Sequence, residues 1–219
     1  MMKMILSTGL LICSALSLLA QEDAYEGDPT TIYWGWEVGI ESGLIFGSAS
    51  PNAEAAAKFN DVKGNIGVGV SAGFSASFPL SEKLALRPQI LLTILPTTVT
   101  YDFANFKEAT HEIYPLTCDI PIHLAINNPL QTRKMGLLIG PAIEFRIPAL
   151  ESGRPKASTA VLRADIGIAL PKLWGKSDIL IELVYGATVT NMLTGGDDVF
   201  DSWYENVGRH RLGLRMNFY

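Results

Sequence analysis

Hydrophobic and polar residues alternate along most of the chain, most clearly between Ile66 and Phe78. The even-numbered positions of this segment are Ile, Val, Ala or Phe, whereas the odd-numbered positions are all Gly or Ser. Side chains of a β-strand point alternately to two faces, whereas a helix repeats every 3.6 residues. The segment therefore predicts a β-strand with one apolar face and one polar face.

The same alternation recurs along the chain and predicts eight strands. Most of them are long enough to cross a bilayer at a tilt, which takes about 9–11 residues. The predicted strands are 33–46, 66–78, 84–101, 112–126, 135–147, 158–170, 179–192 and 209–218. Because proline cannot donate to a strand ladder, we expect a bulge or a frayed position at each proline inside them. These prolines are Pro88, Pro96, Pro121 and Pro141.

The connections between the predicted strands alternate in length. The short ones are 79–83, 127–134 and 171–178, and the mostly longer, more polar ones are 47–65, 102–111, 149–157 and 193–208. Short turns at one rim and long loops at the other are typical of outer-membrane barrels, whose long loops are extracellular. This pattern predicts that both termini lie in the periplasm.

Aromatic residues lie near the ends of the predicted strands, where an interfacial girdle requires them. The periplasmic rim would contain Trp34, Trp36, Phe78, Trp174, Phe218 and Tyr219, and the outer rim Phe46, Tyr101, Phe103, Tyr114, Trp203 and Tyr204.

The first twenty residues read as a signal peptide, with Lys3 ahead of an apolar run and a cut after Ala20. No later segment offers 18 continuous apolar residues, which disfavours a transmembrane helix. An exported chain this apolar can enter a membrane only as a closed β-barrel, since open sheet edges cannot be satisfied in lipid. We therefore expect a signal peptide (1–20), a periplasmic segment (21–32) and an all-β, single eight-stranded antiparallel up-and-down transmembrane β-barrel (33–219).

Composition and charge argue against a disordered protein and against a nucleic-acid-binding protein. With 48% hydrophobic and 18% charged residues the chain is unlike a disordered one. The net charge of −5 and the lack of a basic cluster argue against a nucleic-acid partner. Cys13 leaves with the signal peptide, so Cys118 has no disulfide partner, and we expect it to be a small apolar side chain on a strand. No Cys or His spacing indicates a metal or a cofactor.

Charged residues gather on the face of each strand opposite the apolar one. An Arg facing lipid would cost about 2–4 kcal/mol at the midplane, whereas inside the barrel its planar guanidinium can pair with carboxylates. An eight-stranded barrel is just wide enough for side chains to fill, so we expect a charge-filled lumen that conducts ions poorly. The predicted interior network is Glu37, Glu41, Arg87, Asp119, His123, Glu144, Arg146, Arg163, Asp165, Glu182, Arg209, Arg211 and Arg215, with Gln89 among them.

Five segments in this order carry a family resemblance: 73–84, 86–91, 119–121, 137–141 and 182–191. Together they resemble the small outer-membrane β-barrel proteins of the porin-family or PorT-like group, common in Bacteroidetes. The resemblance implies a barrel in the cell outer membrane. It implies little about activity, since fold does not give function.

The sequence gives little support for an enzyme. Only His111, His123 and His210 could serve a nucleophilic triad, and no Ser or His motif accompanies them. The acidic stretch 195–201 with Glu205 offers oxygen ligands for calcium but lacks the EF-hand spacing, so we expect a solvated loop.

We expect a non-enzymatic, monomeric outer-membrane barrel with a structural or cell-surface interaction role. Its partners would be outer-membrane lipid and other envelope proteins. The alternatives are a component of a secretion or envelope-assembly apparatus, a narrow passive channel, a lipid-modifying enzyme, and a soluble lipocalin-like barrel.

Overall fold

A computed structural model describes residues 31–49, 59–103, 109–113, 116–147, 158–174, 177–192 and 204–219. The predicted signal peptide (1–20), nearly all of segment 21–32 and the acidic stretch 195–201 lie outside these residues. The same holds for Tyr114 and Trp203, while the side chains of Tyr101, Phe103, Trp174 and Tyr204 are also outside the description.

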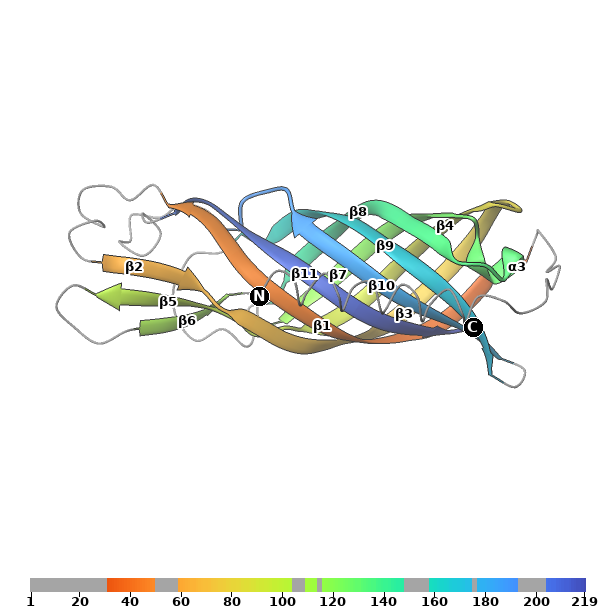
Figure 1. The fold of residues 1–219 in the computed structure, drawn as a ribbon, viewed down its shortest axis with the longest axis horizontal. Coiled ribbons are helices and arrows are strands. Elements are labelled where there is room, and N and C mark those ends of the chain that lie inside the picture. The colour runs from red at the N-terminus through yellow and green to blue at the C-terminus, as the bar shows by residue number, and fades with distance from the viewer. Residues whose placement is uncertain are drawn as a thin grey trace, which may run out of the picture.

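Eight strands form a closed antiparallel barrel (Figure 1). Neighbours around the barrel follow the order β1-β11-β10-β9-β8-β7-β4-β3, and β3 pairs with β1 to close it. The strands are β1 (Tyr33–Ala49), β3 (Ile66–Ser81), β4 (Leu84–Ile94), β7 (Leu116–Ile126), β8 (Gly136–Arg146), β9 (Ala160–Trp174), β10 (Ser177–Thr188) and β11 (Tyr204–Phe218). The predicted fold of eight antiparallel strands in one closed barrel is confirmed.

A second, three-stranded sheet extends from one end of the barrel (Figure 1). It contains β2 (Phe59–Gly64), β5 (Thr97–Phe103) and β6 (Ala109–Ile113) in the order β2-β5-β6. Two predictions are corrected here. The predicted strand 84–101 is two strands, and the predicted loop 47–65 contains β2.

The division between β4 and β5 falls at Leu95 and Pro96. Pro96 has no N–H to give to a ladder, so a change of partner at this point leaves no donor unpaired. Asn65 marks the matching break between β2 and β3, where its side-chain amide donates to the hydroxyls of Thr98 (3.1 Å) and Thr100 (2.8 Å). The predicted strand 112–126 is likewise divided, between β6 and β7.

The opposite end of the barrel has the short connections and a single helical turn, α3 (Pro129–Thr132) (Figure 1). Asn127 and Arg133 on either side of it have positive φ angles of 61° and 53°, which reverse the chain within a few residues. Leu130 of this turn is fully buried. The connection predicted as a short turn thus also packs an apolar side chain into this end.

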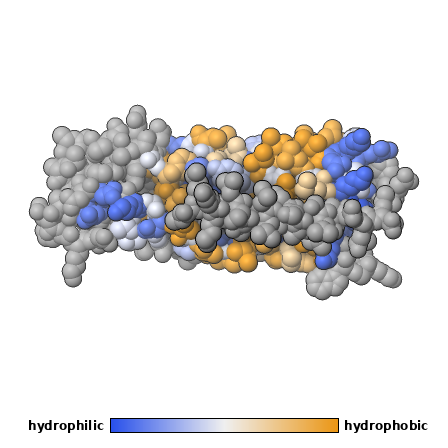
Figure 2. Space-filling view, viewed as in Figure 1, coloured by the Kyte–Doolittle hydropathy of each residue, from blue (hydrophilic) through white to orange (hydrophobic). Residues whose placement is uncertain are grey.

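The wall of the barrel is apolar outside, as the alternation predicts. On β3 the outward Ile66 and Val68 are 73% and 65% exposed, while the inward positions carry Gly and Ser. Apolar residues gather over the middle of the barrel and hydrophilic ones toward both ends (Figure 2). Among the described residues, no helix is long and apolar enough to cross a membrane.

Buried apolar side chains lie inside the barrel near both ends. Those near α3 form one cluster of Ala85, Ala125, Leu138, Ala169, Leu180 and Val184. Toward the three-stranded sheet the buried apolar residues are Ile45, Leu95, Val99, Met192 and Val207. Most charged residues of the interior lie between these two groups, while Arg87 and Glu182 lie among the residues of the first.

Candidate functional site

Every residue of the predicted interior network except Arg146 is buried in the structure. Arg146 is the last residue of β8 and is half-buried. Gln89 is buried with the others. These side chains come from β1, β4, β7, β8, β9, β10 and β11, and their contacts centre on Glu144, on Glu41 and on Glu182.

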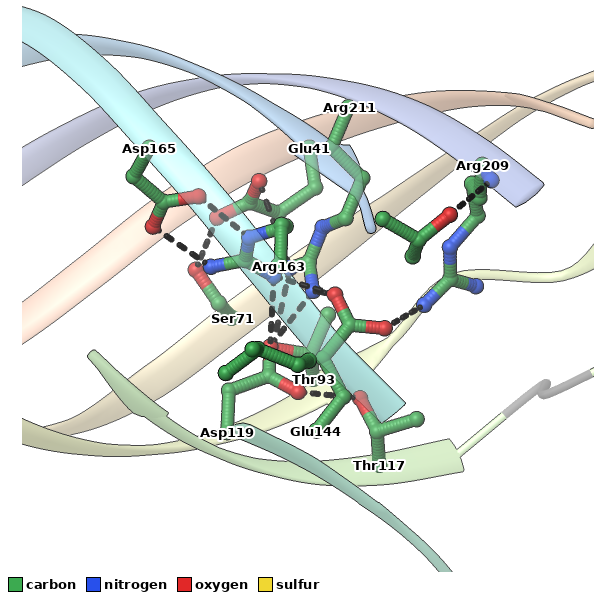
Figure 3. Close-up of polar contacts among 12 residues, drawn as sticks. Glu41, Ser71, Thr93, Thr117, Asp119, Glu144, Arg163, Asp165, Arg209 and Arg211 are labelled. Carbon is green, nitrogen blue, oxygen red and sulfur yellow. Dashed lines mark hydrogen bonds and ion pairs between the residues drawn. The ribbon is translucent and has the colours of Figure 1, made fainter. Parts of the chain in front are cut away.

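Arg163 on β9 lies at the centre of the first set of contacts (Figure 3). Its Nε donates to Oδ1 of Asp165 at 2.5 Å, and its Nη2 donates to Oδ2 at 2.9 Å. Its Nη1 contacts Glu144. Gly186 lies opposite Asp165 on β10, and a Cβ there would come within 2.4 Å of Asp165 Oδ1. A glycine at this position therefore leaves the room that the bidentate pair needs.

Glu144 on β8 accepts hydrogen bonds from three guanidinium groups (Figure 3). Besides Arg163 these are Arg209 at 2.7 Å and Arg211 at 2.8 Å. Arg211 donates with the same nitrogen to Asp119 at 2.6 Å. Three guanidinium groups from two strands, β9 and β11, are thus tied to one carboxylate of β8, and each of these side chains is buried.

Asp119 on β7 is further satisfied by two hydroxyl groups. The Oγ1 atoms of Thr93 and Thr117 donate to it at 2.8 and 2.7 Å. On the same strand, Nε2 of His123 lies 3.1 Å from Oδ2 of Asp165. His123 thus belongs to the polar network inside the barrel.

A second set of contacts joins β1 and β11, the first and last strands of the barrel. Nε of Arg215 on β11 donates to Glu41 on β1 at 2.8 Å, and Ser71 Oγ donates to the same carboxylate oxygen at 3.0 Å. Arg211 lies 3.5 Å from the other oxygen of Glu41. Glu37 is different, because Arg215 lies 3.7 Å away and neither carboxylate oxygen has a hydrogen-bond partner.

Arg87 and Glu182 pair nearer to α3, and Tyr219 belongs with them. The Arg87 Nη2 donates to the Tyr219 hydroxyl at 2.6 Å, and Ser75 Oγ lies 3.1 Å from that oxygen. The prediction that Tyr219 belongs to the aromatic girdle of the periplasmic rim is wrong, because its hydroxyl contacts Arg87 inside the barrel. Phe218 continues the outward face, so the next residue along the strand direction turns inward.

The three histidines do not form one site. His123 is inside the barrel, His210 is on the outer wall beside Tyr185, and His111 belongs to β6 in the three-stranded sheet. Among the described residues, no group of three or more His, Cys, Asp or Glu is arranged to hold a metal ion. Cys118 is half-buried on β7 and unpaired with any other cysteine.

The arrangement is therefore a set of buried guanidinium and carboxylate groups, most of which pair with one another, with Glu37 the least satisfied. A buried pair of this kind need not stabilise a fold relative to apolar residues, but removing one partner leaves an uncompensated charge and is strongly destabilising. The geometry supports a rigid, side-chain-filled interior.

No protein-family model and no curated protein matches this sequence, so no family match supports the PorT-like resemblance.

Among solved structures, the chain is similar to Ail, the attachment invasion locus protein of Yersinia pestis, whose structure contains the heparin analogue sucrose octasulfate. That likeness has 8% identity and a TM-score of 0.42 and covers 84% of this chain and 96% of that chain. The outer membrane protein OprG from Pseudomonas aeruginosa is similar at 8% identity and a TM-score of 0.46, over 84% of this chain and 92% of that one. The translocator domain of the autotransporter NalP from Neisseria meningitidis has 8% identity and a TM-score of 0.35, over 99% and 98% of the two chains. At these identities the likeness concerns the fold alone.

Proposed function

We propose that this chain is a non-enzymatic barrel of the cell outer membrane with a structural or cell-surface interaction role. The outward apolar wall is the observation that carries the proposal. Trp36 and Phe46, outward aromatic residues of β1, are ten residues apart, which is about 33 Å along a strand. At a tilt of about 45° this spans about 23 Å, close to the apolar band of about 25 Å in outer-membrane barrels.

The aromatic residues near α3 support the placement of one membrane interface. Trp36 and Phe74 have ring centroids 4.1 Å apart, and Trp34 and Phe78 have centroids 5.6 Å apart. All four belong to the neighbouring strands β1 and β3 and lie near the α3 end of the barrel. Amphipathic aromatic side chains gather at the headgroup level of membranes.

The proposed orientation puts α3 and the short connections in the periplasm. The long connections and the three-stranded sheet then face outward. The sheet would supply the contacts of a surface role, because its outer strands β2 and β6 are edge strands. Edge strands present backbone groups to which another chain can add.

The proposed lumen is closed to ions. Most of the charged groups that could attract ions are already paired, as with Glu144 and its three guanidinium partners, and Glu37 is the exception. Buried apolar residues lie at both ends of this charged stretch. We therefore expect a conductance close to that of a bare bilayer.

Cell fractionation tests the location. The expected result is recovery in the outer-membrane fraction with a gel mobility that changes on heating, as the barrel unfolds. Recovery in the aqueous fraction without detergent would contradict the proposal and favour the lipocalin-like alternative. Protease treatment of intact cells, with cleavage expected only in the long connections, tests the orientation.

Two further measurements test the alternatives. Steady, sizeable conductance in planar bilayers would favour the narrow channel over the closed lumen. A PorT-like role in secretion or envelope assembly would instead give a stable complex with other envelope proteins after gentle detergent extraction, whereas our proposal predicts a monomer.

A further inference from the structure

Three aromatic side chains from three neighbouring strands meet on the outer wall of the barrel. Phe46 of β1 stacks on His210 of β11, with ring centroids 4.1 Å apart. Tyr185 of β10 also stacks on His210, at 5.8 Å, and its hydroxyl lies 2.5 Å from the imidazole Nδ1. Phe46 and Tyr185 are about two-fifths exposed, so this cluster is part of the outward surface.

The polar pair in this cluster is unusual for the outward surface. The residues that face His210 across the strands are Leu44 and Ala187, and Leu212 follows it on the same face. A neutral imidazole carries one N–H group, and when the Tyr185 hydroxyl donates to Nδ1, that hydrogen is on Nε2 of His210. Hydrocarbon offers no acceptor for an N–H group, and leaving one unsatisfied in lipid costs several kcal/mol.

The position of His210 along the membrane normal explains how its N–H group can avoid the hydrocarbon. His210 and Phe218 lie on the same face of β11, eight residues apart, which is about 26 Å along the strand. At a tilt of about 35–45° the two are about 20 Å apart across the membrane. With Phe218 at the interface near α3, His210 lies about 5 Å inside the opposite edge of the apolar band of about 25 Å, next to the headgroups of the other leaflet.

The surface beside His210 leaves room for a ligand. Ala187 lies opposite His210, and Ala164 lies opposite Ala187 on the next strand. Larger outward side chains border this low stretch, among them Leu162, Ile166 and Val189. The guanidinium groups of Arg209 and Arg211, on either side of His210 in sequence, point inward and pair with Glu144. Among the described residues, the polar groups of this patch are therefore the His210 imidazole and the Tyr185 hydroxyl.

We propose that His210, Tyr185 and Phe46 form a binding site for the phosphate group of a membrane lipid in the leaflet nearer the three-stranded sheet. The Nε2–H of His210 donates to a phosphate oxygen. Tyr185 fixes the orientation of the imidazole through Nδ1, and Phe46 packs against the ring face. This inference rests on the proposed membrane location.

The test uses the full-length protein with ¹⁵N-labelled histidine, folded in alkyl maltoside micelles, which contain no phosphate. Dioctanoyl phosphatidic acid is titrated in, and the imidazole ¹⁵N shifts are followed by NMR. The expected result is a saturable change at His210 Nε2 with the His123 signals unchanged. Two further titrations define the ligand: dioctanoylglycerol, which has the same chains without phosphate, and inorganic phosphate alone.

Two variants show which groups bind the phosphate. A hydrogen bond to a charged group contributes about 1.5–3 kcal/mol, so His210→Gln should weaken the binding of phosphatidic acid, measured by native mass spectrometry, by about tenfold or more. Tyr185→Phe, which keeps the ring but frees the imidazole, should weaken it less. Val70→Gln, which puts the same new side chain on the outward face of β3, is the matched control and should bind like the unmodified protein.

The outcomes separate this inference from the proposed location. Equal binding by His210→Gln, or equal binding of dioctanoylglycerol, would overturn the phosphate site. A saturable response to inorganic phosphate of the same strength would overturn the lipid as ligand. Heat-modifiable mobility of every variant shows that the barrel is intact, and failure of the unmodified protein to insert into vesicles would contradict the membrane location itself.

Discussion

Replacing Glu144 with Gln should remove more stability than any other carboxylate-to-amide change in the interior. At an effective dielectric constant of about 20, two unit charges 4 Å apart attract by about 4 kcal/mol. Glu144 touches three guanidinium groups, and those contacts offset the cost of removing the charges from water. Breaking a buried pair by removing one partner costs about 3–5 kcal/mol. We expect a loss in this range, because Arg163, Arg209 and Arg211 would each lose a charged hydrogen-bond partner.

Glu37→Gln is the matched control. Both carboxylates are buried in the same barrel, but Glu37 has one guanidinium at 3.7 Å and no hydrogen bond to either oxygen. Neutralising it removes a weak attraction and also the cost of an ill-satisfied buried charge. We expect its unfolding free energy to change by less than about 1 kcal/mol.

The assay is equilibrium unfolding in urea from lipid vesicles, followed by tryptophan fluorescence and checked by gel mobility. Trp34 and Trp36 lie exposed on the outer wall, so their emission should shift when the wall leaves the lipid. Equal unfolding free energies for the two variants would refute the reasoning, because they would show that the guanidinium contacts of Glu144 carry no net stability.

Three further predictions concern the same interior. Gly186→Ala should lower the unfolding free energy by about 1–3 kcal/mol, because the new methyl group would come within 2.4 Å of Asp165 Oδ1 and 2.6 Å of Arg163 Cδ; urea unfolding measures it, and an unchanged midpoint would contradict it. Tyr219→Phe should cost about 1–3 kcal/mol by leaving the buried Arg87 without its 2.6 Å acceptor, and the same assay should show no loss if that contact is unimportant. Arg163→Ala should raise single-channel conductance in planar bilayers above that of the unmodified protein, and a persistently closed lumen would show that Arg163 does not block it.

The number and facing of the barrel strands could be predicted because alternation is a local signal. Ile66 to Phe78 sorts into two faces without reference to any other strand, and the barrel keeps that sorting. Alternation also predicts the position of Tyr219 correctly. Strict alternation from Arg215 and Asn217 places it inward, and the expectation of an aromatic rim overrode that signal.

The three-stranded sheet could not be predicted from alternation, because a strand that changes its partner keeps its period. Leu95 and Pro96 interrupt the ladder, yet Thr97–Phe103 is a strand again with new neighbours. Pro88, Pro121 and Pro141 show the opposite outcome, since β4, β7 and β8 run through them. A proline therefore signals a local irregularity, and tertiary contacts decide whether the strand continues in the same sheet.

The membership of the interior group followed from the facing of each strand, but the pairs within it did not. Arg209 and Arg211 on β11 meet Glu144 on β8 across the barrel, and the chain separates them by more than sixty residues. Which carboxylate each guanidinium reaches depends on strand stagger and on the space left by glycines such as Gly186. Neither quantity can be read from the sequence of one strand.

The most direct test of the account is whether lipid chains touch one face of each strand and not the other. In vesicles or micelles with protonated acyl chains, nuclear Overhauser contacts from the chain methylenes should reach the side chains of Val68, Val70 and Phe74. They should be absent for Arg211 and Glu182, which are buried inside the barrel. Methylene contacts at Arg211 or Glu182, or water contacts in place of lipid contacts at Val68 and Val70, would contradict the account.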